Sequence, residues 1–325
     1  MSGSLVDSVV NPLWLDRPAL EAVDVAVEAD RLGYTRMWIG EMATWDAFVL
    51  AQAILGRTEH LDLVVGPLAV TVRSPANIAT GIASLAQFTA RRIDVAIGSS
   101  SKVVVQQWHG RRWGGAAALE ESASALRVLL DGGTARVSGS QVSSNGYRLR
   151  LEPPRSAVCV AAFGRQAIGV AAAHADRMVV NLVSPELVAR LRDELDRATS
   201  AAGRPRMPLA AWIPVAVDPA PEALRQIAHG VVAYLGAPGY SDMFRAAGFD
   251  DIVDMAAQGA HPKQLLAEMP TELLQTVSAL GGRTEVLGKL AQFRDAGVDE
   301  VAIVPATMGD ERATRTLSSL GPNVH

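Results

Sequence analysis

Glu41 is the residue of this sequence best placed to do proton chemistry. It follows the apolar run RMWIG at residues 36–40, and it is the only carboxylate in the short segments that directly follow the first five predicted strands. A partly buried carboxylate can have its pKa raised toward neutrality, and it can then donate or accept a proton. An acid near a helix N-terminus or beside a cation is also a common structural feature. Glu41 is therefore a candidate catalytic residue, with a salt-bridge partner as the alternative.

Small residues dominate the segments that follow two later strands. These segments are Gly98, Ser99 and Ser100 in DVAIGSSS, after the fourth strand, and Phe163, Gly164 and Arg165 in AAFGRQAIG, after the fifth. Glycine lets a ligand approach the backbone, and hydroxyl groups and the N–H groups of a helix start can bind phosphate oxygens. Each segment alone could be an ordinary turn between a strand and a helix. Together they favour a phosphate-binding cradle.

Several reaction classes lack their residues in this sequence. The six histidines form no HxH or HExxH motif, which argues against a metal site. There is no Gly-x-Ser-x-Gly elbow, no P-loop, and no Gly-x-Gly-x-x-Gly after the first strand. A pocket of glycines, small hydroxyls and apolar groups suits a large planar cofactor that brings its own reactivity.

The overall composition is that of a globular protein. The 325 residues are 49% hydrophobic and 20% charged, with a net charge of −4. This charge gives no broad basic surface, so neither nucleic acid nor an anionic membrane is an expected partner. The single cysteine, Cys159, cannot form an internal disulfide, and no signal peptide or apolar stretch of about 18 residues occurs. We therefore expect a cytoplasmic protein.

Eight short runs rich in Val, Ile and Leu alternate with helical patterns. Most of the runs are apolar at consecutive positions, as in parallel strands that are buried on both faces. The eight runs are residues 5–10, 36–40, 61–66, 92–98, 157–162, 177–183, 209–217 and 299–305. Eight strand–helix units predict an α/β fold, the (β/α)8 TIM barrel, in which catalytic residues lie at the carboxyl ends of the strands.

Two segments interrupt this alternation. Residues 134–150 contain the pair Asn145 and Gly146 between two alternating runs, which predicts a β-hairpin excursion before the fifth strand. Residues 236–280 predict a long helical insertion between the seventh and eighth strands. Insertions of this size are often lids or substrate walls, and a helical bulge or an oligomer contact is the alternative.

Four quoted segments resemble the luciferase-like monooxygenase superfamily, and specifically its coenzyme F420-dependent oxidoreductases of actinobacteria. They are LGYTRMWIGEM, LDLVVGPLAVTVRSPANIATGIASLAQFTARRIDVAIGSSS, VQQWHGRRW and VAAFGRQAIGVAAAHADRMVVNLVSPE, and the resemblance covers residues 5–217 and 283–305. It implies a single TIM-barrel domain over residues 1–325 and a homodimer. It also implies a deazaflavin or FMN ring across the carboxyl ends of the strands.

The resemblance further assigns roles to the strand ends. It implies a non-prolyl cis peptide and a bulge behind the ring, near Leu68 to Val70, so Leu68 and Ala69 are expected to contact the cofactor. The loops after the fourth and fifth strands would hold the ribityl chain and phosphate. The expected residues there are Gly98, Ser99, Ser100, Phe163, Gly164 and Arg165. Apart from the resemblance, the charge of Arg73 makes it a further candidate partner for the anionic group, with an ordinary solvated arginine as the alternative.

The sequence departs from the family pattern after the second strand. Many members carry a histidine after the acidic residue, whereas this sequence has Met42 after Glu41. His109, in WHGRRW, is a second candidate catalytic residue, although a lone histidine is more often structural. Met42, Trp45 and Trp108 are the expected substrate contacts.

The expected reaction is hydride transfer between the deazaflavin F420 and a small organic substrate. The cofactor would supply the redox chemistry, and the barrel would supply orientation and a water-poor cavity. Two alternatives stay open: a reduced-FMN monooxygenase on the same barrel, and a catalytically degenerate barrel that binds flavin or nothing, which Met42 favours. No metal is expected.

Overall fold

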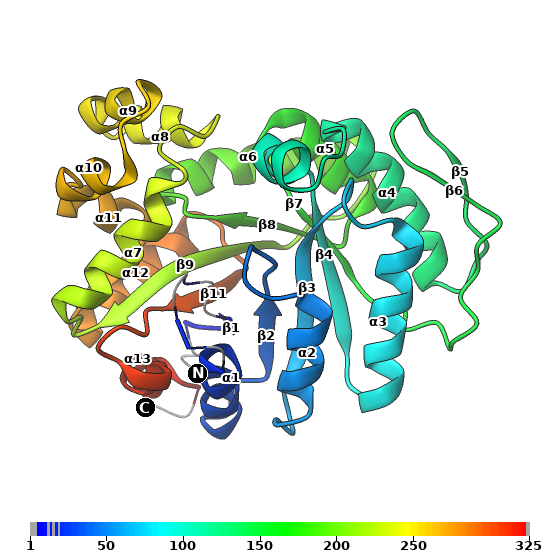
Figure 1. The fold of residues 1–325 in the computed structure, drawn as a ribbon, viewed down its shortest axis with the longest axis horizontal. Coiled ribbons are helices and arrows are strands. Elements are labelled where there is room, and N and C mark those ends of the chain that lie inside the picture. The colour runs from blue at the N-terminus through cyan, green and yellow to red at the C-terminus, as the bar shows by residue number, and fades with distance from the viewer. Residues whose placement is uncertain (1–4, 12–13, 15–16, 19, 323–325) are drawn as a thin grey trace. The chain divides into compact units, whose positions relative to one another are not determined.

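The computed structural model describes residues 5–322 except 12–13, 15–16 and 19. The chain is an α/β protein of the (β/α)8 TIM barrel class, in which parallel strands alternate with helices (Figure 1). Its eight main strands coincide with the eight predicted runs: β1 (Ser8–Val10), β2 (Arg36–Ile39), β3 (Asp62–Ala69), β4 (Ile93–Gly98), β7 (Val158–Ala161), β8 (Arg177–Asn181), β9 (Leu209–Val217) and β11 (Glu300–Pro305). The described chain divides into two compact units, one of residues 35–179 with 193–209, and one of the remaining residues. The expectation of a single domain stays a prediction.

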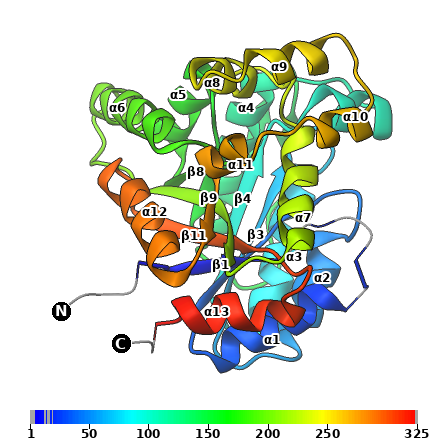
Figure 2. The same cartoon turned by 90° about the vertical axis from the view of Figure 1, so that its left-hand side faces the viewer.

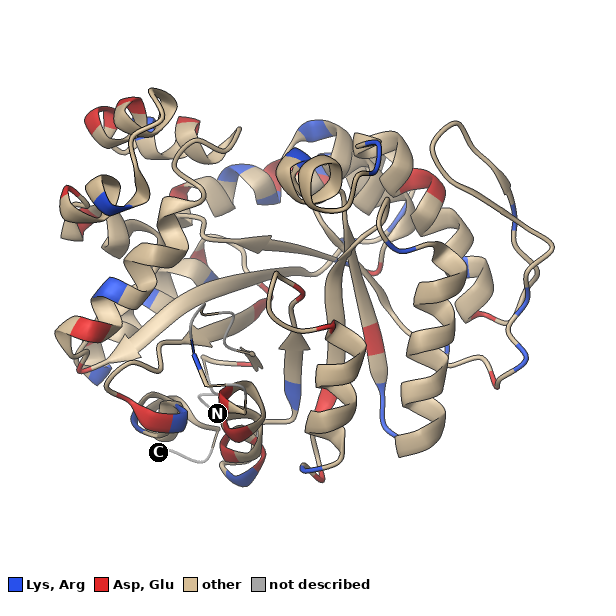
Figure 3. Cartoon of the chain, viewed as in Figure 1, with Lys and Arg blue, Asp and Glu red and all other residues tan. Residues whose placement is uncertain are grey.

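The unit of residues 35–179 and 193–209 contains parallel strands in the order β2, β3, β4, β7, β8. Every residue of β4 is buried, and this explains its consecutive apolar positions, because both faces of the strand are covered. Figure 3 shows that the charged residues belong mainly to helices and loops. The helices of this unit are α2 (Ala47–Leu55), α3 (Pro75–Thr89), the π-helix η1 (Val103–Trp108), α4 (Gly115–Leu130) and α5 (Arg165–His174).

Strand β3 extends beyond its predicted end and carries the irregularity expected of this region. Its pairing with β4 shifts register between Val65 and Leu68, and the cis peptide bond is Gly66–Pro67. The prediction of a non-prolyl cis peptide near Leu68 to Val70 is therefore wrong, since proline makes the cis form accessible here. Gly66 has φ +119°, and a Cβ there would lie 2.1 Å from the carbonyl oxygen of Ala96, so only glycine fits.

The predicted hairpin is present between α4 and β7, but its turn lies elsewhere. Strand β5 (Arg136–Ser138) pairs antiparallel with β6 (Ser143–Asn145), and residues 139–142 form the tip. Asn145 thus ends the second strand, and the expectation of a turn at Asn145 and Gly146 is wrong. The carboxylate of Glu121 in α4 determines the outcome, because it accepts hydrogen bonds from three backbone N–H groups of the tip, at 2.7 to 2.9 Å. A tertiary contact has overridden a local turn preference.

The other unit contains strands in the order β10, β9, β11, β1 and the predicted helical insertion. The insertion forms four short helices, α8 (Tyr240–Ala246), α9 (Asp250–Ala257), α10 (Pro262–Ala267) and α11 (Thr271–Val277), and then the strand β10 (Ala279–Gly281) (Figure 2). Helices α10 and α11 contact α7 (Pro221–Val232). The remaining helices are α1 (Glu21–Arg31), α6 (Pro185–Ala201), α12 (Arg283–Asp295), the 3-10 turn η2 (Glu311–Ala313) and α13 (Thr314–Leu320).

Two half-buried tyrosines fix the start of this insertion to the end of β8. The hydroxyl of Tyr240 donates to the carbonyl oxygen of Asn181 at 2.9 Å, and the Asn181 amide donates to the Tyr234 hydroxyl at 3.5 Å. Burial raises the pKa of both phenols, so both stay protonated near neutral pH. Within the described ranges, no helix has the length and apolar character needed to cross a membrane.

Candidate active site

The carboxyl ends of β3, β4 and β7 form a surface of small residues. The register places Ala69 beside Gly98. A Cβ added at Gly98 would lie 3.4 Å from the Cβ of Ala161 and 3.6 Å from the Cβ of Pro67, so these two strands flank the glycine closely. Leu68 is buried and Ala69 is half-buried at the same edge. The structure therefore brings together the residues that the sequence predicts for the face behind a planar cofactor.

Both serines of the loop after β4 form hydrogen bonds within the protein. The Ser99 hydroxyl donates to the carbonyl oxygen of Gly115 at 3.1 Å. Ser100 has φ +56°, and its carbonyl oxygen accepts a hydrogen bond from the indole N–H of Trp113 at 3.1 Å. The exposed Ser100 hydroxyl is thus the more accessible of the two for a ligand. The loop continues into η1, and π-helical turns are frequent at functional sites.

The loop after β7 opens directly into helix α5. Gly164 is the N-cap residue of α5, no side chain caps the helix, and no heavy atom lies within 4 Å of the position its Cβ would take. The first N–H groups of the helix therefore have no capping side chain and can bind an anion. Arg165 is exposed, and no ion pair joins it to another described residue. Phe163, half-buried, precedes them.

Glu41 forms an ion pair with Arg73, and this pairing was not predicted from the sequence. The guanidinium of Arg73 donates to both carboxylate oxygens of Glu41, with Nε 3.0 Å from Oε2, and the N–H of Ala47 lies 3.3 Å from Oε1. Arg73 Nη2 also lies 2.5 Å from Oδ2 of Asp46. Two carboxylates thus share one cation. Arg73, expected as a partner for an anionic ligand, is already neutralised by them.

This charge cluster organises the loops after β2 and β3. Hydrogen bonding to Glu41 is the largest of the effects that raise the pKa of Arg73. Partial desolvation of Asp46 opposes its ionisation, but the bonds from Arg73 and from the N–H groups of Val49 and Phe48 outweigh desolvation and lower its pKa. These two N–H groups belong to the first turn of α2, which Asp46 caps. Glu41 therefore sits in a rigid network.

The remaining predicted residues lie on exposed parts of the same unit. Met42 is 43% exposed and Trp108 is 55% exposed, whereas Trp45 is half-buried. His109 follows η1, is exposed, and its imidazole makes no hydrogen bond to another described residue. No hydrogen bond or ion pair joins His109 to Glu41 within the described chain. Their roles stay predictions.

Two threonines beside the cluster were not predicted from the sequence. The hydroxyls of Thr44, in the loop after β2, and Thr71, in the loop after β3, are buried and have no hydrogen-bond partner among the described residues. A buried polar group without a partner is costly, and such groups commonly meet a ligand or water. No local motif marks either threonine. Across the described residues, no group of three or more His, Cys, Asp or Glu could hold a metal ion.

Comparison with known proteins places the chain in a family. The model of a family described as luciferase-like monooxygenase matches residues 4–300. A protein of Mycobacterium tuberculosis is 21% identical to this chain, over 94% of this chain and 96% of its own length. Its name describes it, provisionally, as a coenzyme F420-dependent oxidoreductase.

Solved structures share the fold at low identity. The coenzyme F420-dependent tetrahydromethanopterin reductase of Methanopyrus kandleri has a TM-score of 0.83 at 17% identity, over 97% of this chain and 98% of its own. An F420-dependent secondary alcohol dehydrogenase, in complex with an F420-acetone adduct, has a TM-score of 0.78 at 16% identity over the full length of both chains. The FMN-bound oxygenating constituent of 3,6-diketocamphane monooxygenase from Pseudomonas putida has a TM-score of 0.70 at 18% identity, over 98% of each chain. The chain belongs to the luciferase-like monooxygenase family of enzymes.

Proposed function

We propose that this enzyme is an F420-dependent oxidoreductase that transfers a hydride between the deazaflavin and a small organic substrate. The observation that carries the proposal is the small-residue surface of Ala69, Gly98 and Ala161 beside the uncapped start of α5. A flat ring system needs the first feature, and its phosphate needs the second. The names of the mycobacterial relative and of two structural neighbours support the choice of F420.

The residues present fit such a cofactor. Leu68 and Gly98 are buried and Ala69 is half-buried, the neighbours of Gly98 are the small side chains of Ala161 and Pro67, and Ser99 and Ser100 lie on the adjoining loop. Gly164, Arg165 and the N–H groups of α5 would hold the phosphate, and Phe163 would contact the ribityl chain. The orphaned hydroxyls of Thr44 and Thr71 are further polar groups that a ligand could satisfy. When bound, the deazaflavin supplies the hydride chemistry.

The protein's own contribution is orientation and the exclusion of water. Trp45 and Trp108 would cover the substrate, with Met42 replacing the histidine of many family members. Both carboxylate oxygens of Glu41 accept hydrogen bonds, so we assign Glu41 to positioning the loops after β2 and β3. His109 is the remaining candidate for proton transfer, since its imidazole is exposed and not hydrogen-bonded within the described chain.

Cofactor titration of the purified protein tests the proposal. We expect F420 to bind, with quenching of its fluorescence, and FMN to bind more weakly. Gly164→Asp should weaken F420 binding roughly tenfold or more, because it places a negative charge beside the phosphate. Gly164→Ser and Gly164→Ala are matched controls, since the Cβ position is open and φ is −104°. Aspartate is a favourable N-cap residue, so a loss of affinity could not be attributed to an unfolded helix.

A reduced-FMN monooxygenase is the second candidate, supported by the FMN-bound neighbour of similar fold. Binding of FMN with no binding of F420 would favour it, and oxygen consumption with reduced FMN would then be the assay. Binding of neither cofactor would leave the degenerate barrel that the Met42 replacement favours. Equal F420 affinities for Gly164→Asp and wild type would remove α5 from the site.

A further inference from the structure

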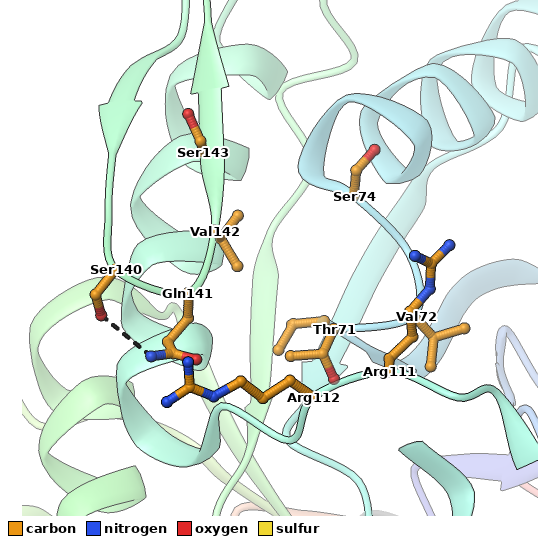
Figure 4. Close-up of a pocket in the computed structure, with 10 residues that line it drawn as sticks. Thr71, Val72, Ser74, Arg111, Arg112, Ser140, Gln141, Val142 and Ser143 are labelled. Atoms are coloured by element: carbon orange, nitrogen blue, oxygen red, sulfur yellow. Dashed lines mark hydrogen bonds between the residues drawn. The ribbon is translucent and has the colours of Figure 1, made fainter. Parts of the chain in front are cut away.

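A pocket of about 430 Å³ lies between the start of α3 and the hairpin tip (Figure 4). Its charged groups do not converge, because Arg112 extends toward Gln141 whereas the guanidinium of Arg111 points away from it. The Gln141 amide and the Ser140 hydroxyl are hydrogen-bonded to each other at 3.3 Å. Polar groups that lie together and keep unused hydrogen-bonding capacity occur instead at the end of β8, in the unit that carries the helical insertion.

The end of β8 has a strained backbone. Asn181 is the last residue of the strand, and Leu182, which follows it, is a buried leucine with φ +50°. A left-handed conformation is unfavourable for leucine, and residues held in this way cluster at binding and catalytic sites. In a (β/α)8 barrel, ligands bind at the carboxyl ends of the strands. Asn181 therefore occupies a position from which a side chain can reach a ligand.

The helical insertion and the turn before it hold this strand end in place. The hydroxyl of Tyr240 donates to the carbonyl oxygen of Asn181 at 2.9 Å, and the N–H of Ser184 donates to the sulfur of Met243 at 3.4 Å. The rings of Tyr234 and Tyr240 pack edge to face, with their centroids 4.9 Å apart. The side chains of Asn181 and Tyr234 are thus positioned before a ligand binds, which lowers the entropy cost of binding.

Two polar groups of this cluster keep unused hydrogen-bonding capacity. The O–H of Tyr234 has no acceptor among the described residues, and Oδ1 of Asn181 has no donor there. Both residues are half-buried, and the Asn181 amide reaches the Tyr234 oxygen only at 3.5 Å. A shielded phenol usually finds a hydrogen-bond partner, because an unpaired O–H costs free energy. One oxygen atom of a bound molecule could satisfy both groups.

The cluster is uncharged and offers one donor and one acceptor. Burial raises the pKa of Tyr234 and Tyr240, so both phenols are neutral near neutral pH. No charged side chain is hydrogen-bonded to Asn181 or Tyr234 within the described chain. A carbonyl oxygen can accept from Tyr234, and a hydroxyl group can in addition donate to Asn181. An ionised group is less suited, because neutral partners compensate the cost of burying a charge poorly.

We infer that Tyr234 and Asn181 form a subsite for the carbonyl or hydroxyl oxygen of an uncharged substrate. The inference rests on the proposed function and names its substrate class, an alcohol and the ketone or aldehyde related to it by oxidation. The two forms differ by one hydride on carbon, exchanged with the deazaflavin, and one proton on oxygen, exchanged with water. Tyr234 and Asn181 bind the oxygen of either form and so hold the reacting carbon in place.

Fluorine NMR of the protein labelled with 3-fluorotyrosine tests the subsite, because the chain has only four tyrosines. Each resonance is assigned with a single tyrosine-to-phenylalanine variant. We expect cyclohexanone and cyclohexanol, titrated without cofactor, to shift the resonances of Tyr234 and Tyr240 saturably, whereas those of Tyr34 and Tyr147 stay unchanged. No shift of the Tyr234 resonance with either ligand would overturn the inference.

Two substitutions separate the donor from the acceptor. Tyr234→Phe should weaken the binding of both ligands about fivefold, read from the Tyr240 resonance, because one neutral hydrogen bond is lost. Asn181→Ala should weaken cyclohexanol more than cyclohexanone, since only the alcohol donates to Oδ1. The matched control is Tyr147→Phe, which removes the hydroxyl of an exposed tyrosine beside the hairpin, and an unchanged Tyr34 resonance shows that each variant is folded. Equal affinities of Tyr234→Phe and wild type would contradict the subsite, and equal losses of both ligands in Asn181→Ala would contradict the acceptor.

A second titration, with F420, separates the substrate from the cofactor as the source of the oxygen. A shift of the Tyr234 resonance with F420 but with neither cyclohexyl ligand would assign the subsite to a hydroxyl of the ribityl chain and overturn its assignment to the substrate. Binding of F420 without a response to the cyclohexyl ligands would remove the subsite alone. Binding of the cyclohexyl ligands without binding of F420 would remove the proposed redox function alone, so the two failures give different results.

Discussion

Arg73 connects two loops through its carboxylate partners, and this connection defines what Glu41 can do. The side chains of Arg73 and Glu41 are 17% and 19% exposed, so the pair is largely shielded from solvent screening. The guanidinium also lies 5.2 Å from the ring centroid of Phe48. Such a network fixes the ends of β2 and β3 next to the small-residue surface. A residue held in this way acts on the site through position.

Glu41→Gln tests that role. We expect the free energy of unfolding to fall by about 1 kcal/mol, since a charge-assisted pair becomes a neutral one. Turnover should decrease more than cofactor affinity, because the loops shift while the cofactor contacts persist. The pH profile of kcat should keep its shape, and steady-state kinetics from pH 5 to 9 would measure it. Disappearance of one limb of the profile would instead show that Glu41 transfers a proton.

Single residues also show where sequence reasoning stops. Gly98 and Gly164 could be singled out from the sequence because glycine after a buried strand leaves a visible local signal, and their contact with a cofactor stays a prediction. The pairing of Arg73 with Glu41 could not be predicted, because the two residues are 32 positions apart and only the fold brings their loops together. Thr44 and Thr71 likewise leave no pattern, since an orphaned hydroxyl is a property of its surroundings.

At the scale of elements, the hairpin depends on one carboxylate of a neighbouring helix. Burial of Glu121 opposes its ionisation, but hydrogen bonds from the N–H groups of Val142, Gln141 and Ser140 outweigh burial and lower its pKa. A Cβ at Gly139 would lie 2.0 Å from Cδ of Glu121, so a larger residue there would displace the carboxylate that binds the tip. The sequence predicted the hairpin from alternation and Asn145–Gly146, but the position of its turn depends on α4.

Glu121→Ala should therefore release the tip while leaving α4 folded, because alanine is the strongest helix former. We expect the amides of residues 140–142 to exchange with solvent at least roughly tenfold faster, as expected when a hydrogen bond that contributes more than about 1 kcal/mol is lost. Hydrogen exchange followed by mass spectrometry measures this. The neighbouring substitution Glu120→Ala is the control, because the Glu120 carboxylate lies 3.7 Å from Nε2 of His174 and no hydrogen bond joins it to the tip within the described chain. Unchanged exchange at the tip in Glu121→Ala would show that the β5–β6 ladder alone orders it.

At the scale of the whole molecule, burial on both faces made the barrel predictable. All nine residues of β9 and all six of β11 are buried, so each strand leaves a continuous apolar run. The insertion was predicted as helical, but its anchoring was not. Tyr234 and Tyr240 reach Asn181 across more than 50 positions. The periodicity of apolar residues depends on the local environment of a helix or strand, whereas hydrogen bonds between distant residues depend on the tertiary fold.

The balance of carboxyl groups predicts how the whole molecule responds to acid. Among the residues that the structure describes, five carboxyls have a lowered pKa in the folded state: Glu28, Asp46, Glu121, Glu186 and Glu222. The pKa of Glu28 is lowered chiefly by its hydrogen bonds with Arg31. Asp7 behaves in the opposite way, because burial raises its pKa. A group with a lowered folded pKa contributes stability above its unfolded pKa, and that stability is lost as the pH falls through the folded pKa.

We therefore expect the denaturant midpoint to change little between pH 8 and pH 6 on account of these groups, and to fall progressively below the unfolded glutamate value of 4.5. Urea unfolding from pH 3 to pH 8 measures the effect. Asp46→Asn should flatten the acid limb, because it removes one of the five groups, while asparagine still caps α2. A midpoint that rises on acidification below pH 4.5 would mean that the raised pKa of Asp7 outweighs the five lowered ones. Asp7 accepts a hydrogen bond from the Val301 N–H at 2.6 Å. Asp7→Asn removes this titrating group, so the midpoint of that variant would then fall on acidification and identify Asp7 as the cause.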